Sequence, residues 1–306
     1  MPVSPPPPTP VIQRQDSPRG IASALCAFGW WGLLTLYWKA LGDMSAYEQM
    51  SHRILWTVAT LVPIIILTGR LTVLRAVARQ RRLVVGLLCS TVCIGLNWYV
   101  YIWGISQNRV LEISLGYFMN PLVSALIGCM VLKERFSRPQ MIGVLLAGLG
   151  VLWSVVGYGE LPWLSLTLAI CFALYGLARK LAPVDPACCV FLETLLLLPI
   201  AAIVLTFPCT DRQNSDIALF VLMLSGPLTL LPLMAFNYAA QHVRLTVLGL
   251  TQYLSPSISF FLGIWVFREP FDLRTLLTFV CIWAGLFVFT WGSWRLLHPP
   301  RRSGSV

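Results

Sequence analysis

The sequence has few charged residues. Lys, Arg, Asp and Glu together make up 11% of its 306 residues, whereas 57% of the chain is hydrophobic and the mean hydropathy is +0.76. An average soluble domain carries roughly 25% charged residues, so a chain of this composition cannot cover its own surface in water. The shortage of charge excludes an ordinary soluble enzyme, a disordered regulator and a nucleic-acid-binding module.

The sequence also lacks the motifs of several familiar chemistries. It has no Walker phosphate-binding loop, no Gly-x-Ser-x-Gly elbow, no His-Glu-x-x-His pair and no acidic cluster for magnesium. Nine cysteines are present, mostly inside apolar runs, where a free cysteine packs as a small hydrophobe. Cys89 and Cys93 would share a helix face, but no His or carboxylate nearby completes a metal site. We therefore expect no cofactor, no metal and no enzymatic activity.

Long apolar runs are what the sequence does contain. A transmembrane helix needs roughly 20 apolar residues, and continuous runs indicate helices rather than the alternating strands of a barrel. The sequence therefore predicts an all-α polytopic membrane protein. The ten predicted spans are 21–41, 50–68, 83–104, 111–132, 139–157, 161–179, 187–208, 217–240, 246–267 and 273–295.

The two ends of the chain are predicted to be tails outside the membrane spans. Residues 1–19 are proline-rich, with a run from Pro5 to Pro8, and predict a disordered cytoplasmic tail, whereas 297–306 form a basic cytoplasmic tail. The start of the chain does not have the basic start followed by a short apolar run of a secretory signal.

The basic residues lie mostly on one side of the predicted membrane. With a cytoplasmic amino terminus, 16 of the 22 Lys and Arg fall on the cytoplasmic side and five outside, while Arg53 lies inside the second span. This distribution follows the positive-inside rule, so both termini are predicted to be cytoplasmic. The net charge of +10 thus indicates orientation rather than a nucleic-acid partner. The densest cluster, Arg70 to Arg82, is either a topology anchor or a lipid-binding surface.

The two halves of the chain resemble each other. An offset of 135 pairs Pro121 with Pro256, and an offset of 141 pairs His52 with Glu193. Further pairs are Arg109/Arg244, Leu115/Leu250, Ser124/Ser259, Gly128/Gly263, Val131/Val266, Glu134/Glu269, Phe136/Phe271, Lys39/Lys180 and Ala46/Ala187. Chance matching between apolar sequences explains shared Leu and Val, but less easily the shared Pro, Gly, Glu and Phe. We predict two repeats, 20–157 and 158–296, of five spans each. Because five is odd, the second repeat is inverted, as in secondary transporters.

The segment EISLGYFMNPLVSALIGCMVLKERF at 112–136 resembles the RarD-like branch of the EamA family, within the drug/metabolite transporter superfamily. Further similar stretches are HRILW at 52–56, NWYVYIWG at 97–104, YGLARK at 175–180, LETLLLLPIAA at 192–202, LGLTQYLSPSISFFLG at 248–263 and FREPF at 267–271. The resemblance implies ten helices in two inverted EamA repeats in the bacterial inner membrane. It also implies a transporter, in particular an exporter, of small metabolites or drugs.

Three polar residues within spans are candidates for coupling, because charge inside a bilayer is costly and usually faces a cavity or a partner. Glu193 is a candidate proton carrier or counter-charge for a cationic substrate; capping a neighbouring helix or reaching headgroups is the structural alternative. Arg53 could bind an anionic substrate or extend to the outer headgroups. His52 could carry a proton or make a structural hydrogen bond.

Two Pro-containing pairs predict the level of a central site. Asn120–Pro121 and Ser255–Pro256 each lie near mid-membrane, and proline leaves a backbone carbonyl unpaired, which lipid tolerates only where a cavity, water or side chain satisfies it. Simple packing kinks are the alternative.

Other candidate residues lining a substrate cavity carry amide or aromatic groups. They are Asn97, Tyr99, Trp103, Tyr117, Asn237, Gln252 and Tyr253. Many aromatic residues belong instead to the interfacial belt, and glycines such as Gly143, Gly148 and Gly150 predict close helix contacts.

The function these features favour is a secondary transporter working by alternating access, with a small-molecule substrate, membrane lipid around it and protons as a candidate coupling ion. A membrane-embedded enzyme or lipid-handling protein is the alternative, and a non-transporting sensor or assembly subunit a further one. The substrate, the transport direction, the coupling ion and the oligomeric state are not indicated by the sequence.

Overall fold

The computed structural model describes residues 17–41, 44–132, 137–158, 161–181, 184–207, 219–243 and 251–297. Every element in these ranges is a helix. The helices are α1 (Pro18–Ala40), α2 (Ala46–Leu67), α3 (Leu71–Ala78), α4 (Arg81–Ser106), α5 (Val110–Leu132), α6 (Arg138–Tyr158), α7 (Trp163–Leu181), α8 (Pro186–Thr206), α9 (Leu219–Met223), α10 (Ser225–His242), α12 (Leu254–Phe261), the π-helical turn η2 (Leu262–Val266) and α13 (Leu273–Leu297). Most of both predicted tails lies outside the described residues.

The helices correspond to the ten predicted spans. In the described part of the chain, eight helical segments are long and apolar enough to cross a membrane, and one of them combines α9 with α10. Two shorter apolar helices, α7 and α12 with η2, fill the remaining two predicted spans. The prediction of an all-α polytopic membrane protein is confirmed, and the chain is an integral membrane protein.

Helix boundaries differ from the predicted spans where local signals act. α2 begins at Ala46 rather than at residue 50, because the Ser45 hydroxyl accepts the Glu48 backbone N–H at 3.3 Å and caps the helix. Asp185 caps α8 in the same way by accepting the Cys188 N–H at 3.1 Å, and its carboxylate also pairs with Arg70 at 2.7 Å. The short helix α3 was not predicted; it lies within the basic segment from Arg70 to Arg82.

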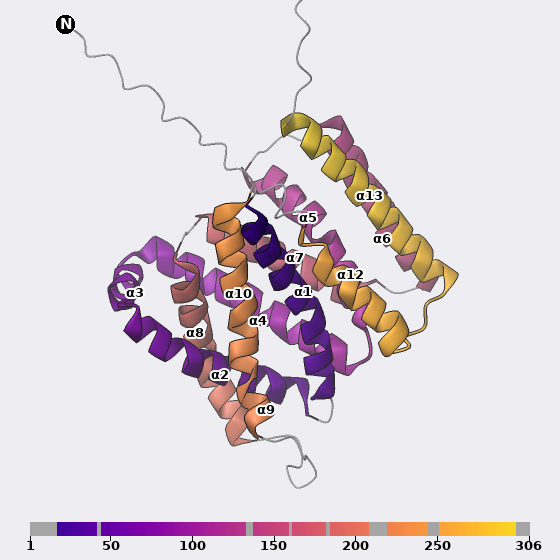
Figure 1. Cartoon of the computed structure of the whole chain (residues 1–306). Helices are drawn as coiled ribbons and strands as arrows, with labels where there is room; N and C mark the ends of the chain where they lie inside the picture. The colour runs from indigo at the N-terminus through magenta and orange to yellow at the C-terminus, as the bar shows by residue number, and fades with distance from the viewer. Residues whose placement is uncertain are drawn as a thin grey trace, which may run out of the picture.

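Most of the extensive helix pairs join one half of the chain to the other (Figure 1). α5 packs on α7, and the corresponding helices of the other half, α12 and α1, also pack together. Replacing each helix by its counterpart in the other half likewise turns α1·α10 into α4·α7 and α2·α10 into α4·α8. Three further pairs join equivalent helices of the two halves: α2·α8, α5·α12 and α6·α13. This pattern of contacts is what two related halves inserted in opposite orientations produce.

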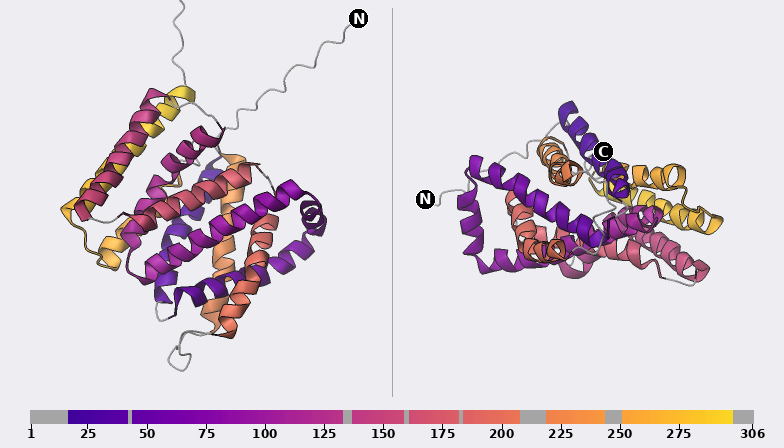
Figure 2. Two further views of the ribbon diagram at one scale, coloured as in Figure 1. Left: turned by 180° about the vertical axis from the view of Figure 1, so that it is seen from behind. Right: turned by 90° about the horizontal axis from the view of Figure 1, so that it is seen from below.

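The last helices of the two halves, α6 and α13, run side by side at one edge of the molecule (Figures 1 and 2). A Cβ atom added to Gly143 would lie 2.6 Å from the Gly285 carbonyl oxygen, and one added to Gly285 would lie 2.6 Å from the Gly143 oxygen. A Cβ at Gly150 would lie 2.9 Å from the Cys281 Cβ. The expected close contacts are therefore confirmed for Gly143 and Gly150. They are wrong for Gly148, where nothing lies within 4 Å.

The outer surface of the helices is apolar. Val156, Trp265 and Phe287 are each 73% exposed, a large apolar exposure that a soluble protein avoids and a lipid environment accommodates. Polar side chains such as Thr35, Asn97 and Glu193 are instead almost fully buried. These three polar groups thus lie between the helices and not on the outer surface.

Candidate substrate site

Two of the predicted cavity residues are hydrogen-bonded to each other. The Tyr117 hydroxyl on α5 donates to Asn97 Oδ1 on α4 at 3.2 Å, and Asn97 Nδ2 donates to the Leu168 carbonyl of α7 at 3.1 Å. Asn97 is 1% exposed. This chain of bonds joins α5 and α4 of the first half to α7 of the second.

Arg53 on α2 lies close to this pair. Its guanidinium carbon is 4.0 Å from the centroid of the Trp98 ring and 5.3 Å from that of the Trp38 ring. The residue is 6% exposed, so it is enclosed by protein on almost all sides. Tyr117 interacts with it electrostatically.

A second polar chain crosses from the first half to α12. The hydroxyls of Tyr101 and Thr35 are 3.1 Å apart, and those of Thr35 and Ser259 are 3.2 Å apart. Thr35 is fully buried. Hydroxyl groups from α4, α1 and α12 therefore meet inside the bundle.

The two prolines occupy different settings. Pro121 lies inside α5, and the side-chain oxygen of the preceding Asn120 is buried with no hydrogen-bond partner among the described residues. Pro256 lies in the first turn of α12, where the missing N–H costs no helical bond. Its carbonyl accepts the Ser114 hydroxyl of α5 at 2.7 Å, while Ser255 precedes it in the same turn. In the described residues, the expected symmetry of two mid-helix breaks is thus not reproduced.

Glu193 forms a separate polar centre. The carboxyl oxygen Oε1 accepts the Ser90 hydroxyl of α4 at 2.6 Å and the Cys189 thiol at 3.2 Å. Tyr175 and Arg179 of α7 interact with it electrostatically. Its other oxygen, Oε2, is buried with no hydrogen-bond partner among the described residues.

The hydrogen bonds around residues 52 and 193 repeat across the two halves. Ser90 Oγ donates to the Leu87 carbonyl at 3.0 Å and to the Glu193 side chain. Its counterpart at an offset of 135, Ser225, donates to the Leu222 carbonyl at 2.7 Å and approaches the His52 carbonyl at 3.4 Å. Since His52 and Glu193 are themselves paired by the offset of 141, equivalent serines hold equivalent positions. His52 is 9% exposed.

Several predicted residues lie away from the Asn97–Tyr117 pair. Tyr99 packs against Tyr47 with ring centroids 4.8 Å apart, and Tyr47 is 56% exposed. Trp103 packs against Trp163 at 5.2 Å. Tyr253 stacks on Phe118 at 6.3 Å, and Gln252 interacts with Tyr253. Asn237 lies on α10, but its side chain is outside the described residues.

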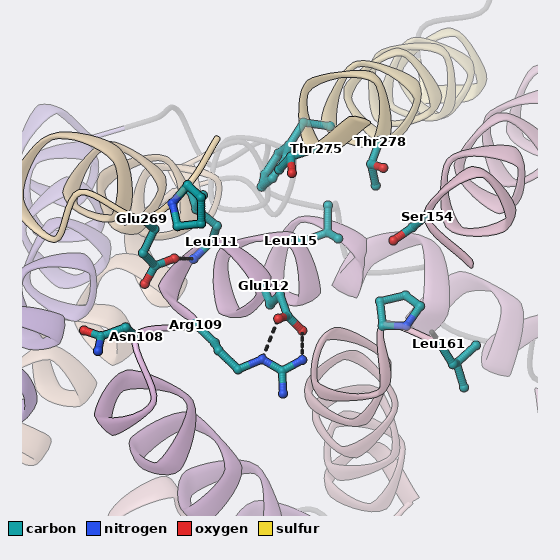
Figure 3. Close-up of a pocket in the computed structure, with 13 residues that line it drawn as sticks. Asn108, Arg109, Leu111, Glu112, Leu115, Ser154, Leu161, Glu269, Thr275 and Thr278 are labelled. Carbon is teal, nitrogen blue, oxygen red and sulfur yellow. Dashed lines mark hydrogen bonds and ion pairs between the residues drawn. The ribbon is translucent and has the colours of Figure 1, made fainter. Parts of the chain in front are cut away.

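An open cavity of about 320 Å³ lies at the amino-terminal end of α5 (Figure 3). The Glu269 carboxylate accepts the backbone N–H groups of Val110 and Leu111 at 2.6 and 2.7 Å, and so caps α5 from a distant segment. Burial raises the pKa of the Glu269 carboxyl, and these two donors oppose the shift. Arg109 and Glu112 form an ion pair in the same cavity.

None of the predicted cavity residues lines this cavity or a second, apolar one of about 360 Å³ beside Trp56 and Phe220. Within the described residues, four of the candidates lie in two buried polar centres, with Arg53, Asn97 and Tyr117 in one and Glu193 in the other.

Several residues in these centres were missed from the sequence. Trp38, Trp98 and Tyr101 surround Arg53, and Ser90 and Tyr175 surround Glu193. The signal for Ser90 was present, since the offset of 135 pairs it with Ser225. Trp98 and Tyr101 lie in the stretch from which Asn97, Tyr99 and Trp103 were chosen, so the helical face was the missing information.

The fold is that of an integral membrane protein built from two related, oppositely oriented halves. A family model described as "EamA-like transporter family" matches residues 18–156 and again residues 162–291. The chain belongs to this family, as the resemblance implied, and is a transporter of the drug/metabolite type.

Similar proteins from other bacteria support this family assignment. An uncharacterized transporter of Vibrio cholerae is 38% identical, over 95% of this chain and 98% of its own length. Protein RarD of Escherichia coli is 35% identical, over 91% and 96%, and uncharacterized transporter YojE of Bacillus subtilis is also 35% identical, over 91% and 96%. A solved crystal structure covers 93% of this chain and 99% of its own, with a TM-score of 0.58 and 17% identity, and supports the fold alone.

Proposed function

We propose that this protein is a secondary transporter that exports small metabolites or drugs across the bacterial inner membrane by alternating access, with both termini in the cytoplasm. Its partners are then a small-molecule substrate, the surrounding lipid and, as coupling ion, the proton. The observation that carries the proposal is the set of polar contacts buried between the halves, which a membrane protein keeps only for a structural or functional reason. The positive-inside distribution of Lys and Arg supports the orientation.

The route for substrate runs between the two halves. Asn97 binds the Leu168 carbonyl, and Thr35 meets Ser259, so these two contacts join helices of different halves. Rocking one half against the other breaks such contacts on one side and keeps them on the other. Asn120 Oδ1, which has no partner among the described residues, supplies an acceptor for a solute at the same level.

Glu193 is the proposed proton-coupling residue. It is fully buried on α8, and one carboxyl oxygen is held by Ser90 while the other has no hydrogen-bond partner among the described residues. Tyr175 and Arg179 lie on α7, so a change in the charge of this carboxyl group alters the contact of α4 and α8 with α7. His52, at the equivalent position of the other half, is the second candidate.

The test uses purified protein in proteoliposomes, with counterflow of a panel of amino acids, antibiotics and organic ions. We expect saturable flux of at least one solute, which a pH gradient accelerates. In Glu193→Gln, exchange persists but the pH gradient no longer drives it; Glu112→Gln, at an ion-paired carboxylate, is the matched control and keeps the response. Absence of saturable flux for every solute would contradict transport, and a full pH response in Glu193→Gln would contradict the coupling role.

A further inference from the structure

Arg53 is a buried cation without an anionic partner. The side chain is 6% exposed, and no carboxylate in the described part of the chain pairs with it. A buried charge without a counter-charge is strongly unfavourable. At 1.5 Å per residue, Arg53 lies about 10 Å along α2 from the start of the helix. The aromatic contacts with Trp98 and Trp38 offset only part of that cost.

The contacts of Arg53 leave its hydrogen-bonding edge available. Stacking on an aromatic ring uses the flat face of a guanidinium group, whereas its N–H groups point outward in the plane and match a carboxylate in a two-pronged arrangement. Nε is buried and has no hydrogen-bond partner among the described residues. The tryptophan rings orient the group but cannot accept these in-plane hydrogens as an anion does.

The neighbouring tyrosines stabilise the cation but do not replace an anion. Tyr37 and Tyr117 interact with Arg53 electrostatically. Each donates its hydroxyl hydrogen elsewhere, Tyr37 to the Val221 carbonyl at 2.9 Å and Tyr117 to Asn97. They therefore present oxygen lone pairs to their remaining surroundings, and the N–H groups that could hold an anion belong to Arg53.

The surroundings of Arg53 reach the second half of the chain by three routes. Tyr37 bonds to α9, Tyr117 reaches α7 through Asn97, and Tyr101 reaches α12 through Thr35. An anion that binds Arg53 thus acts at the contacts that alternating access must break and remake.

We propose that Arg53 is the substrate-binding residue for an organic anion, a small molecule carrying a carboxylate, held between the indole-stacked guanidinium and the interface of the two halves. This inference rests on the proposed transport function and names its substrate class. The occluded position of Arg53 in this conformation means that the anion enters when the halves move apart on one side.

The experiment measures binding and counterflow of matched solutes by the purified protein. The probes are benzoate, its neutral analogue benzamide, the cation benzylamine, and chloride and inorganic phosphate as simple anions. The variants are Arg53→Met, which keeps an unbranched side chain that packs on tryptophan, and Arg53→Lys. Arg109→Gln, an outer arginine in an ion pair, is the control. Thermal unfolding of each variant without solute reports its folding.

We expect benzoate to bind and move saturably and Arg53→Met to weaken its binding at least about thirtyfold, since truncating one partner of a buried charge pair has effects of that order. Arg53→Lys weakens binding less, and Arg109→Gln leaves it unchanged. Because removing a buried unpaired charge relieves its desolvation cost, Arg53→Met unfolds at the same or a higher temperature than the wild type. That combination separates a binding residue from a structural one.

Three outcomes would overturn the proposal. The first is benzamide or benzylamine moving saturably while benzoate does not, which leaves transport intact and removes the anion class. The second is chloride or phosphate displacing benzoate at equal concentration, which assigns a simple counter-ion to Arg53. The third is Arg53→Met retaining benzoate affinity, or unfolding at a much lower temperature than Arg53→Lys. Binding of benzoate without flux would support the anion site and contradict transport itself.

Discussion

Single residues at equivalent places in the two halves do different chemistry. Ser90 and Ser225 each donate a hydrogen bond to a carbonyl of the preceding helical turn, but Ser90 also binds a carboxyl group and Ser225 only approaches a backbone carbonyl. Both halves thus keep a serine as the donor, but its partner residue is the acid Glu193 in one half and His52 in the other. Function at this scale comes from the departure from symmetry.

The same substitution at both serines separates the two roles. Ser90→Ala leaves Glu193 Oε1 with the Cys189 thiol alone, and we expect a loss of about 1–3 kcal/mol, the cost of a lost partner at a buried polar group. Ser225→Ala removes a longer, neutral contact, and we expect a loss of at most about 1 kcal/mol. Denaturant or thermal unfolding in detergent measures both. Equal losses would contradict the assignment of Ser90 as the support of Glu193.

At this scale the sequence could not select the helix face, for a geometric reason. Asn97 and Tyr101 are four residues apart and share a helix face, whereas Tyr99 lies two residues from each and points elsewhere. The sequence indicated Asn97, Tyr99 and Trp103 in this stretch but not Trp98 or Tyr101. Selecting the face required knowledge of Trp38 and Tyr117, which come from other helices.

At the scale of helices, glycine decides how close two spans come. α6 is apolar all round, so its sequence does not indicate which face packs on protein and which on lipid. Gly143 faces α13 at backbone distance, whereas Gly148 on the same helix faces open space. The spans themselves were predictable because their length and composition are fixed by the bilayer.

Alanine at these two glycines has opposite effects. Gly143→Ala forces α6 away from the Gly285 carbonyl, and we expect it to destabilise the protein by about 1–3 kcal/mol. Gly148→Ala meets no neighbour, so the gain of an alanine within a helix stabilises the protein by about 0.5–1 kcal/mol. Unfolding measured on the two variants in parallel checks the difference in sign. A loss of stability at Gly148 would show that this face is also packed.

At the scale of the whole molecule, the proposed orientation in the membrane rests on the distribution of charge alone. The predicted topology places most basic residues on one side, and the turn at Arg70, with the basic segment that follows it, lies next to the Asp185 cap of α8. What charge could not indicate was the packing order of the helices, because that order pairs elements distant in sequence.

Labelling of single cysteines tests the orientation. In a cysteine-free background, Gln107→Cys, exposed at the end of α4, is expected to react with a membrane-impermeant maleimide added to whole cells in which the inner membrane is accessible. Gln80→Cys, exposed at the start of the same helix, is expected to react only after the membrane is permeabilised. The reverse pattern would place both termini outside.

The cross-half pairing of the helices has a consequence for synthesis. α5 packs on α7, α1 on α10 and α6 on α13. The first five spans are therefore synthesised before their main packing partners. Until the second half is inserted, the polar groups that are buried in the complete fold face lipid or one another. Two separately translated halves, divided near residue 160, should therefore assemble only when made together, and a nascent first half should be the stage at which quality-control proteases act most readily.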